Sequence, residues 1–152
     1  MKTALVVFLL LTCAASGQIE LEAHVGRVLP RDGMLDVSLS ILIKNVSDSD
    51  IVVPTDNIGP IWSFEKTKVT VLFAARVPKR RDAPVVESVY RFMPVKLAPG
   101  EITEIRGSST LIGDQDLSHI AIVYWISDEV ADRYGFAKVE ARTRTRYPMD
   151  AE

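Results

Sequence analysis

The chain has 152 residues, of which 47% are hydrophobic and 25% are charged, and its formal net charge at pH 7 is −2. This composition is typical of a folded globular domain. The near balance of charges argues against a general binder of nucleic acid or other polyanions.

The first 17 residues have the order of a secretory signal. Lys2 provides a short positive start, residues 4–11 are uninterrupted and apolar, and residues 13–17 offer small side chains at which a signal peptidase could cut. The apolar run is too short to span a bilayer. We therefore predict a signal peptide over 1–17 and a single domain over 18–152, with cleavage before Gln18 or, alternatively, before Ser16.

Cys13 is the only cysteine of the chain and lies inside this segment. If it leaves with the signal, the mature chain of about 135 residues enters an oxidising compartment without a disulfide, and its core must be sufficient alone. The alternative is lipidation of Cys13, which fits poorly because Thr12 precedes it. We expect a secreted or periplasmic protein, tethered to a membrane only if Cys13 is lipidated.

After residue 18 the dominant pattern is the alternation of apolar and polar side chains that is typical of β-strands. It predicts strands that are separated by Asn, Asp, Pro and Gly turns. The predicted strands are 19–25, 35–43, 51–53, 69–75, 88–97, 102–111, 119–127 and 136–146. Pro94 places 88–97 at an edge or a bulge.

Residues 119–127 form the most continuously apolar and β-branched run, which predicts a central strand with Trp125 in the core. Residues 128–134 are expected to form a helical turn or a loop. About seven or eight short strands without a long amphipathic helix predict an all-β fold, namely an antiparallel immunoglobulin-like β-sandwich.

Two basic segments are candidates for binding a partner. Lys79, Arg80 and Arg81 lie between two prolines and predict an exposed loop tip that could meet an acidic partner. Arg142 and Arg144 lie on one face of the last strand, in a row that also contains Arg146. Both segments have a simpler interpretation, because such charges also deter pairing between the edges of sheets.

Trp62 lies in a stretch that is predicted to be a loop before the fourth strand. It is interpreted either as an exposed aromatic anchor for a partner or as a ring that covers one end of the core.

Metal ligands are sought among the histidines and the acidic turn. His24 lies on the polar face of the first strand and His119 begins the apolar strand, while Asp48 and Asp50 lie in one turn. A metal site needs three or four converging ligands, and this spacing matches no established motif. No cofactor is predicted.

No arrangement of residues typical of catalysis is recognised, and Asn45-Val46-Ser47 fits the glycosylation sequon, which matters only in a eukaryotic source. We therefore expect a non-enzymatic binding domain of the accessory, inhibitory or immunity type, whose partner is another extracytoplasmic protein. The alternative is a carrier of a metal ion or small ligand, followed by a hydrolase with paired carboxylates.

Overall fold

The computed structural model describes residues 17–56, 58–65, 68–76, 92–112, 117 and 119–146. These residues form nine strands and one short helix. In chain order the elements are β1 (Ile19–Arg31), β2 (Met34–Asn45), β3 (Ile51–Pro54), β4 (Gly59–Glu65), β5 (Lys68–Ala75), β6 (Pro94–Leu97), β7 (Ile102–Ile112), β8 (His119–Ile126), α1 (Asp128–Tyr134) and β9 (Glu140–Arg146). The predicted all-β class is confirmed.

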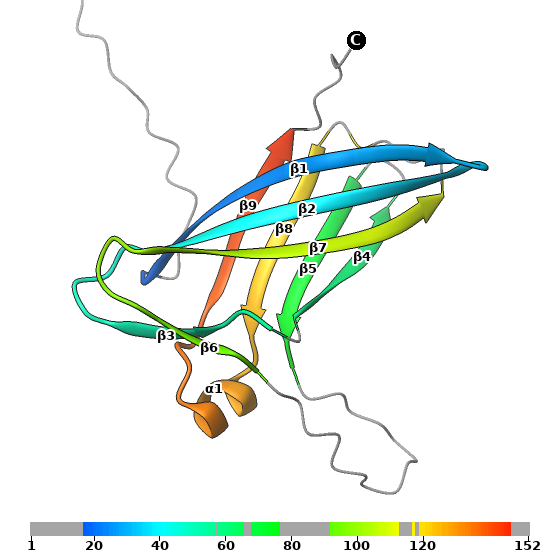
Figure 1. Cartoon of the computed structure of the whole chain (residues 1–152). Helices are drawn as coiled ribbons and strands as arrows, with labels where there is room; N and C mark the ends of the chain where they lie inside the picture. Colours follow the sequence, from blue (N-terminus) through cyan, green and yellow to red (C-terminus); the bar gives the residue numbers. More distant parts are fainter. Residues whose placement is uncertain are drawn as a thin grey trace, which may run out of the picture.

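The strands form three sheets, with the orders β1-β2-β7, β3-β6 and β4-β5-β8-β9. Figure 1 shows the three long strands of the first sheet lying across the four strands of the third. The small β3-β6 sheet and α1 lie together at one end of this arrangement. The predicted segment 1–17, apart from Gly17, lies outside the described residues.

A tight hairpin joins β1 to β2 and makes both strands longer than their alternation suggests. Asp32 and Gly33 connect them, with φ angles of 46° and 77°. Two consecutive positive φ values, with Asp-Gly at the turn, are typical of the type I′ turn that matches the twist of paired strands. The turn therefore carries the pairing to Arg31 and Met34, well beyond the predicted strand end at residue 25.

The core lies between the two larger sheets. Alternate residues of β2 face it from one side, and alternate residues of β5 and β8 face it from the other. These inward residues are Val37, Leu39, Ile41 and Ile43 on β2, Val69, Val71 and Phe73 on β5, and Ile120, Ile122 and Tyr124 on β8. Burial of this apolar surface is the main driving force for the fold.

One strand pair differs from the predicted antiparallel arrangement. β5 and β8 run parallel, with Val71 beside Ile122 and Phe73 beside Tyr124, whereas all other described pairs are antiparallel. A parallel pair needs a long connection between its strands. Here the chain passes through β6 and β7 before it returns as β8, so the four-stranded sheet is mixed. β8 is an interior strand of that sheet, as predicted.

Three further boundaries differ from the sequence-based expectations. Residues 59–65, predicted as a loop around Trp62, form the edge strand β4. The strand predicted from residue 136 begins only at Glu140. Of the predicted strand 88–97, β6 occupies Pro94–Leu97, and 88–91 lie outside the described residues.

The region 128–134, for which the sequence allows either a helical turn or a loop, forms α1. The Ser127 hydroxyl accepts a hydrogen bond from the Val130 amide (3.3 Å), and Gly135 closes the helix with a φ of 70°. These are the usual N-terminal and C-terminal caps of a helix. After the helix, the amide of Ala137 donates to the carbonyl of Val52 (2.8 Å), so this segment is fixed to β3.

Candidate functional site

The register of the four-stranded sheet separates its residues into two faces. The core face contains Val71 and Phe73 of β5 beside Ile122 and Tyr124 of β8. The residues between them point away from the core, because successive side chains of a strand point to opposite faces. The second face, which we call the outer face, is therefore built from the alternate residues of β4, β5, β8 and β9.

The outer face is apolar at its centre. Neighbouring strands place Ile61 beside Leu72 and Leu72 beside Val123, while Ala74 lies beside Trp125. None of these five residues belongs to the core cluster. Ala74 is nevertheless buried (7% exposed), and Leu72, Val123 and Trp125 are half-buried. Ile61 is 37% exposed. We call these five residues the outer patch.

No described helix or strand outside the four-stranded sheet makes extended contact with this patch. Besides their own sheet neighbours, the strands make extended contact only through β9 with β1 and through β4 with β7. Both β1 and β7 belong to the facing sheet, on the core side. A sheet with one face on the core normally carries polar residues on the other. The apolar outer patch departs from that rule, and such surfaces often mark interaction sites.

Charged residues of β9 border the outer patch. Arg142 pairs in register with Val123, Arg144 with Ala121, and Glu140 with Trp125. Arg142 donates to the Glu140 carboxylate through Nη2 (2.6 Å) and Nε (3.3 Å). Among the described residues Arg144 makes no ion pair. The sequence-predicted arginine row is thereby placed beside an apolar surface.

The amino-acid pattern of residues 119–126 already indicated that the outer face is apolar. It is apolar at nearly every position, which predicted a strand buried on both sides and placed Trp125 in the core. The structure corrects this point, because Trp125 is half-buried on the outer face while Tyr124 lies in the core. β5 is also apolar on both faces around Leu72.

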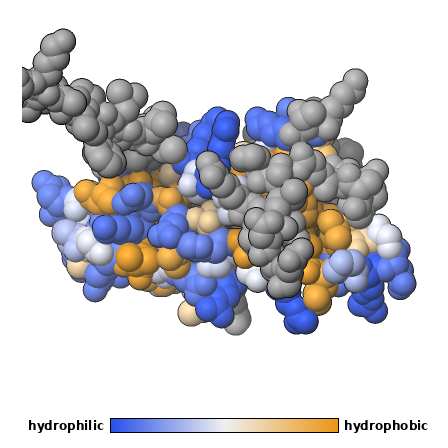
Figure 2. Space-filling model, turned by 90° about the horizontal axis from the view of Figure 1, so that it is seen from above, coloured by the Kyte–Doolittle hydropathy of each residue, from blue (hydrophilic) through white to orange (hydrophobic). Residues whose placement is uncertain are grey.

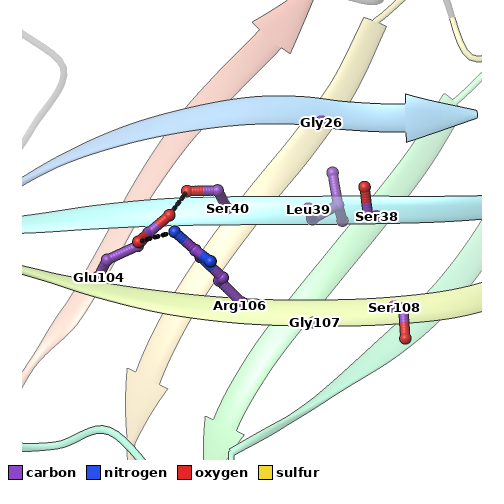
Figure 3. A pocket seen from close by; sticks show the side chains of 8 residues that line it. All are labelled: Gly26, Ser38, Leu39, Ser40, Glu104, Arg106, Gly107 and Ser108. Atoms are coloured by element: carbon purple, nitrogen blue, oxygen red, sulfur yellow. Dashed lines mark hydrogen bonds and ion pairs between the residues drawn. The ribbon is translucent and has the colours of Figure 1, made fainter.

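The outer surface of the three-stranded sheet is very different. Ser40 donates to Glu104 (2.5 Å), and Arg106 forms an ion pair with the same carboxylate (2.8 Å), as Figure 3 shows. The hydrogen bond from Arg106 and, to a smaller extent, that from Ser40 lower the pKa of Glu104. Thr110 donates to Asp36 at 2.6 Å. This surface is therefore polar, and its groups bond to one another.

A shallow depression of about 600 Å³ lies on this polar surface. Among the described residues that line it, Glu104 supplies the only carboxylate. The facing pair of acids that a carboxylate hydrolase requires is therefore not found in it. Small side chains create the hollow, and its lining residues are Gly26, Ser38, Leu39, Ser40, Glu104, Arg106, Gly107 and Ser108 (Figure 3).

The four metal candidates are not brought together where the structure describes them. His24 lies on the outer side of β1, with its Nε2 3.0 Å from a Glu22 carboxylate oxygen. Asp50 forms an ion pair with Lys96 (2.6 Å), and Asp48 is exposed. The backbone of His119 begins β8, but its side chain is outside the description. Within the described ranges no group of three or more His, Cys, Asp or Glu side chains converges.

Trp62 lies on the core side of the edge strand β4. It is partly buried against the core and stacks on Phe64, with ring centroids 6.3 Å apart and an interplanar angle of 5°. Its indole Nε1 is buried and has no hydrogen-bond partner among the described residues. This placement favours the interpretation of a ring that covers the core. Phe64 beside it is 43% exposed.

The predicted basic loop with Lys79, Arg80 and Arg81 lies outside the described residues. Hydrophilic and hydrophobic residues are interspersed over the face seen in Figure 2.

No helix among the described residues is long and apolar enough to cross a membrane. Comparison with protein-family models, curated proteins and solved structures gives no match.

Proposed function

We propose that this chain is a secreted or periplasmic binding domain without catalytic activity, which docks a partner protein on the outer face of its four-stranded sheet. In this proposal residues 1–17 are a cleaved signal peptide, and the mature domain is an immunoglobulin-like sandwich. The observation that carries it is the apolar outer patch bordered by Arg142 and Arg144. Tryptophan and arginine are the residues most enriched at the energetic centres of protein interfaces.

The charges at the border indicate the chemistry of the partner. Arg142 is already bonded to Glu140, whereas Arg144, on the same face, makes no ion pair with any described residue. A partner that places an apolar ridge on Leu72, Val123 and Trp125, and a carboxylate beside Arg144, would complement both features.

The dimensions of the face favour a different protein over a second copy. Four strands about 4.8 Å apart and about seven residues long give roughly 450 Å² for the face. A standard interface buries about 800 Å² per partner. Two copies packed face to face would bury little more than half of that area, so we propose a different protein that also contacts the arginine border beyond the sheet centre.

Site-specific photo-crosslinking in the native compartment tests this proposal. A photoreactive residue at Ile61, which is exposed on the outer face, should crosslink to a partner. A photoreactive residue that replaces Ile102, which is 57% exposed on the polar sheet, is the matched control and should not crosslink to that partner.

Substitutions then connect the crosslink to the face. With the photoreactive group at Ile61, Arg144→Glu should reduce the yield of the crosslinked product at least tenfold, because it replaces the available cation by an anion. Arg31→Glu, an exposed arginine of β1, is the charge control and should leave the yield unchanged. Equal crosslinking from Ile61 and Ile102, or no effect of Arg144→Glu, would exclude this docking surface.

A second candidate function is a carrier of a small polar ligand, supported by the depression of about 600 Å³ on the three-stranded sheet. Its hydroxyl groups and the Glu104–Arg106 pair offer both donors and acceptors. Ser108→Val would remove one hydroxyl and fill part of the hollow. Lower affinity of this variant, by calorimetry, for a small polar molecule that copurifies with the wild type would favour the carrier. An unchanged affinity would argue against it.

A further inference from the structure

The side chain of the sequon asparagine, Asn45, is buried and makes four hydrogen bonds. Asn45 ends β2 and is 0% exposed. Its Nδ2 donates to the carbonyl oxygens of Ser49 (2.8 Å) and Leu97 (2.9 Å). Its Oδ1 accepts from the amide of Ser47 (2.9 Å) and from the Ser47 hydroxyl (2.7 Å). Both hydrogens of the amide nitrogen are therefore used inside the protein.

The same residue connects two turns that are far apart in the sequence. The turn after β2 contains Ser47 and Ser49, and the turn between β6 and β7 contains Gly100 and Glu101. The backbone amide of Asn45 donates to the carbonyl of Glu101 (3.0 Å), and its carbonyl accepts from Gly100 (2.8 Å). Together with the contact to Leu97, these bonds hold the second turn against the end of β2.

N-glycosylation would change this amide directly. It forms a bond between Nδ2 and C1 of a sugar, breaks the bond between C1 and the diphosphate of a lipid-linked donor, and releases one Nδ2 proton. In the folded chain that proton donates to Ser49 or Leu97, and the side chain has no surface through which a sugar could leave. The modified residue would have to abandon one carbonyl and open the contact between the turns.

We propose that Asn45 can be glycosylated only before the chain folds, and that a glycan at Asn45 prevents the two turns from closing. In the mature protein, Asn45-Val46-Ser47 is then a structural clamp instead of a modification site. This inference is independent of the docking surface.

A chain with two sequons provides the test. Arg106→Asn creates a second sequon, together with Gly107 and Ser108, on the outer side of β7, where the Arg106 side chain is 80% exposed. The full chain and this variant are produced in a eukaryotic secretory system. Glycan occupancy at each of the two positions is measured by glycosidase treatment and peptide mass spectrometry. Secreted and retained fractions are analysed separately, and each is digested with a protease to report folding.

We expect secreted, protease-resistant Arg106→Asn protein to carry a glycan at position 106 and none at Asn45. Any chain modified at Asn45 should occur in the retained fraction and be digested rapidly. A secreted, protease-resistant chain with a glycan at Asn45 would overturn the proposal. The second sequon in the same chain shows that the system modifies exposed asparagines, so an empty Asn45 reflects the fold and not the host.

Discussion

At the scale of single residues, two buried polar side chains each connect separate elements. Asn45 connects the turn after β2 to the turn before β7, and Tyr124 connects β8 to β3 through a hydrogen bond from its hydroxyl to the carbonyl of Pro54 (3.2 Å). Buried polar groups of this kind stabilise a fold only while they remain bonded. Removal of either side chain therefore lowers the free energy of unfolding by more than the size of the side chain suggests.

The first prediction concerns Asn45. Asn45→Ala should lower the free energy of unfolding by about 2–4 kcal/mol, because it leaves the carbonyls of Leu97 and Ser49 without their donor. Chemical denaturation monitored by tryptophan fluorescence measures this change. Ser63→Ala, on the exposed side of β4, is the control and should change stability by less than about 0.5 kcal/mol. A change in the free energy of unfolding as small as this for Asn45→Ala would contradict the proposal that Asn45 holds the two turns together.

The second prediction concerns Tyr124 and pH. Burial raises the pKa of Tyr124 above its ordinary value of 10.0. The folded state therefore favours the neutral phenol, and its contribution is fully present below pH 10 and is lost as the pH rises above that value, where the unfolded chain ionises. Tyr124→Phe should be about 1 kcal/mol less stable at neutral pH.

The measurement is the free energy of unfolding of both proteins between pH 8 and pH 11. The stability of the wild type should fall more steeply than that of Tyr124→Phe above about pH 10, so the gap between them narrows. Parallel curves over the whole range would show that Tyr124 ionises equally in both states.

At the scale of the elements, the close approach of β4 to β7 depends on a glycine. A Cβ added to Gly107 would lie 3.1 Å from Cγ of Pro60 and 3.2 Å from Cε1 of Phe73. Glycine in the interior of a strand normally lowers its strand propensity. In the structure Gly107 lets β4 and β5 pack against β7 on the core side.

The third prediction follows from that contact. Gly107→Ala should destabilise the protein by about 1–3 kcal/mol, because the rigid ring of Pro60 and the packed ring of Phe73 have little room to move. Thermal unfolding measures the loss. A second change, Pro60→Ala, should recover part of it in the double variant by removing two of the three close contacts. Gly59→Ala, where the added Cβ meets nothing within 4 Å, is the control and should show a smaller loss.

The elements also show how far alternation predicts a fold. β2, β5 and β8 are predicted at nearly their observed positions because each has a regular pattern of apolar residues that face the core. β7 is also predicted at nearly its observed position, although only Ile105 and Leu111 of its described residues belong to the core cluster. β4 was missed because Gly59 and Pro60 are turn residues in an isolated sequence, and Pro60 is tolerated here on an edge strand. The parallel pairing of β5 with β8 depends on a long connection between the two strands. The alternation of residues within one strand gives no information about that connection.

At the scale of the whole molecule, the two large sheets differ in the surfaces that they present away from the core. The three-stranded sheet shows bonded serines and charges, whereas the four-stranded sheet shows the outer patch with arginines at its border. In the proposed function, the partner docks on the outer patch and not on the polar sheet. Arginines on the edge strand β9 would also oppose edge-to-edge pairing, and both interpretations of the arginine row stay predictions.

The fourth prediction concerns processing of the whole chain. If residues 1–17 are a signal peptide, the mature protein begins at Gln18, contains no cysteine and is recovered in the soluble extracytoplasmic fraction. Intact-mass spectrometry and membrane partitioning measure both properties. A start at Cys13 with an added lipid mass and recovery in the membrane fraction would instead establish the tethered form.

The sequence by itself determined the all-β class, the central place of β8 and the arginine row on β9, because period-two alternation is a local property of each strand. The sequence also suggested His24, Asp48 and Asp50 as metal ligands. It did not predict that Asp50 forms an ion pair with Lys96. Only the tertiary structure decided which apolar residues lie outside the core and that the sequon asparagine is buried. A strand that is apolar on both faces has the same sequence pattern whether one face or both are covered. The difference lies in which elements pack against it, and that depends on contacts between residues far apart in the chain.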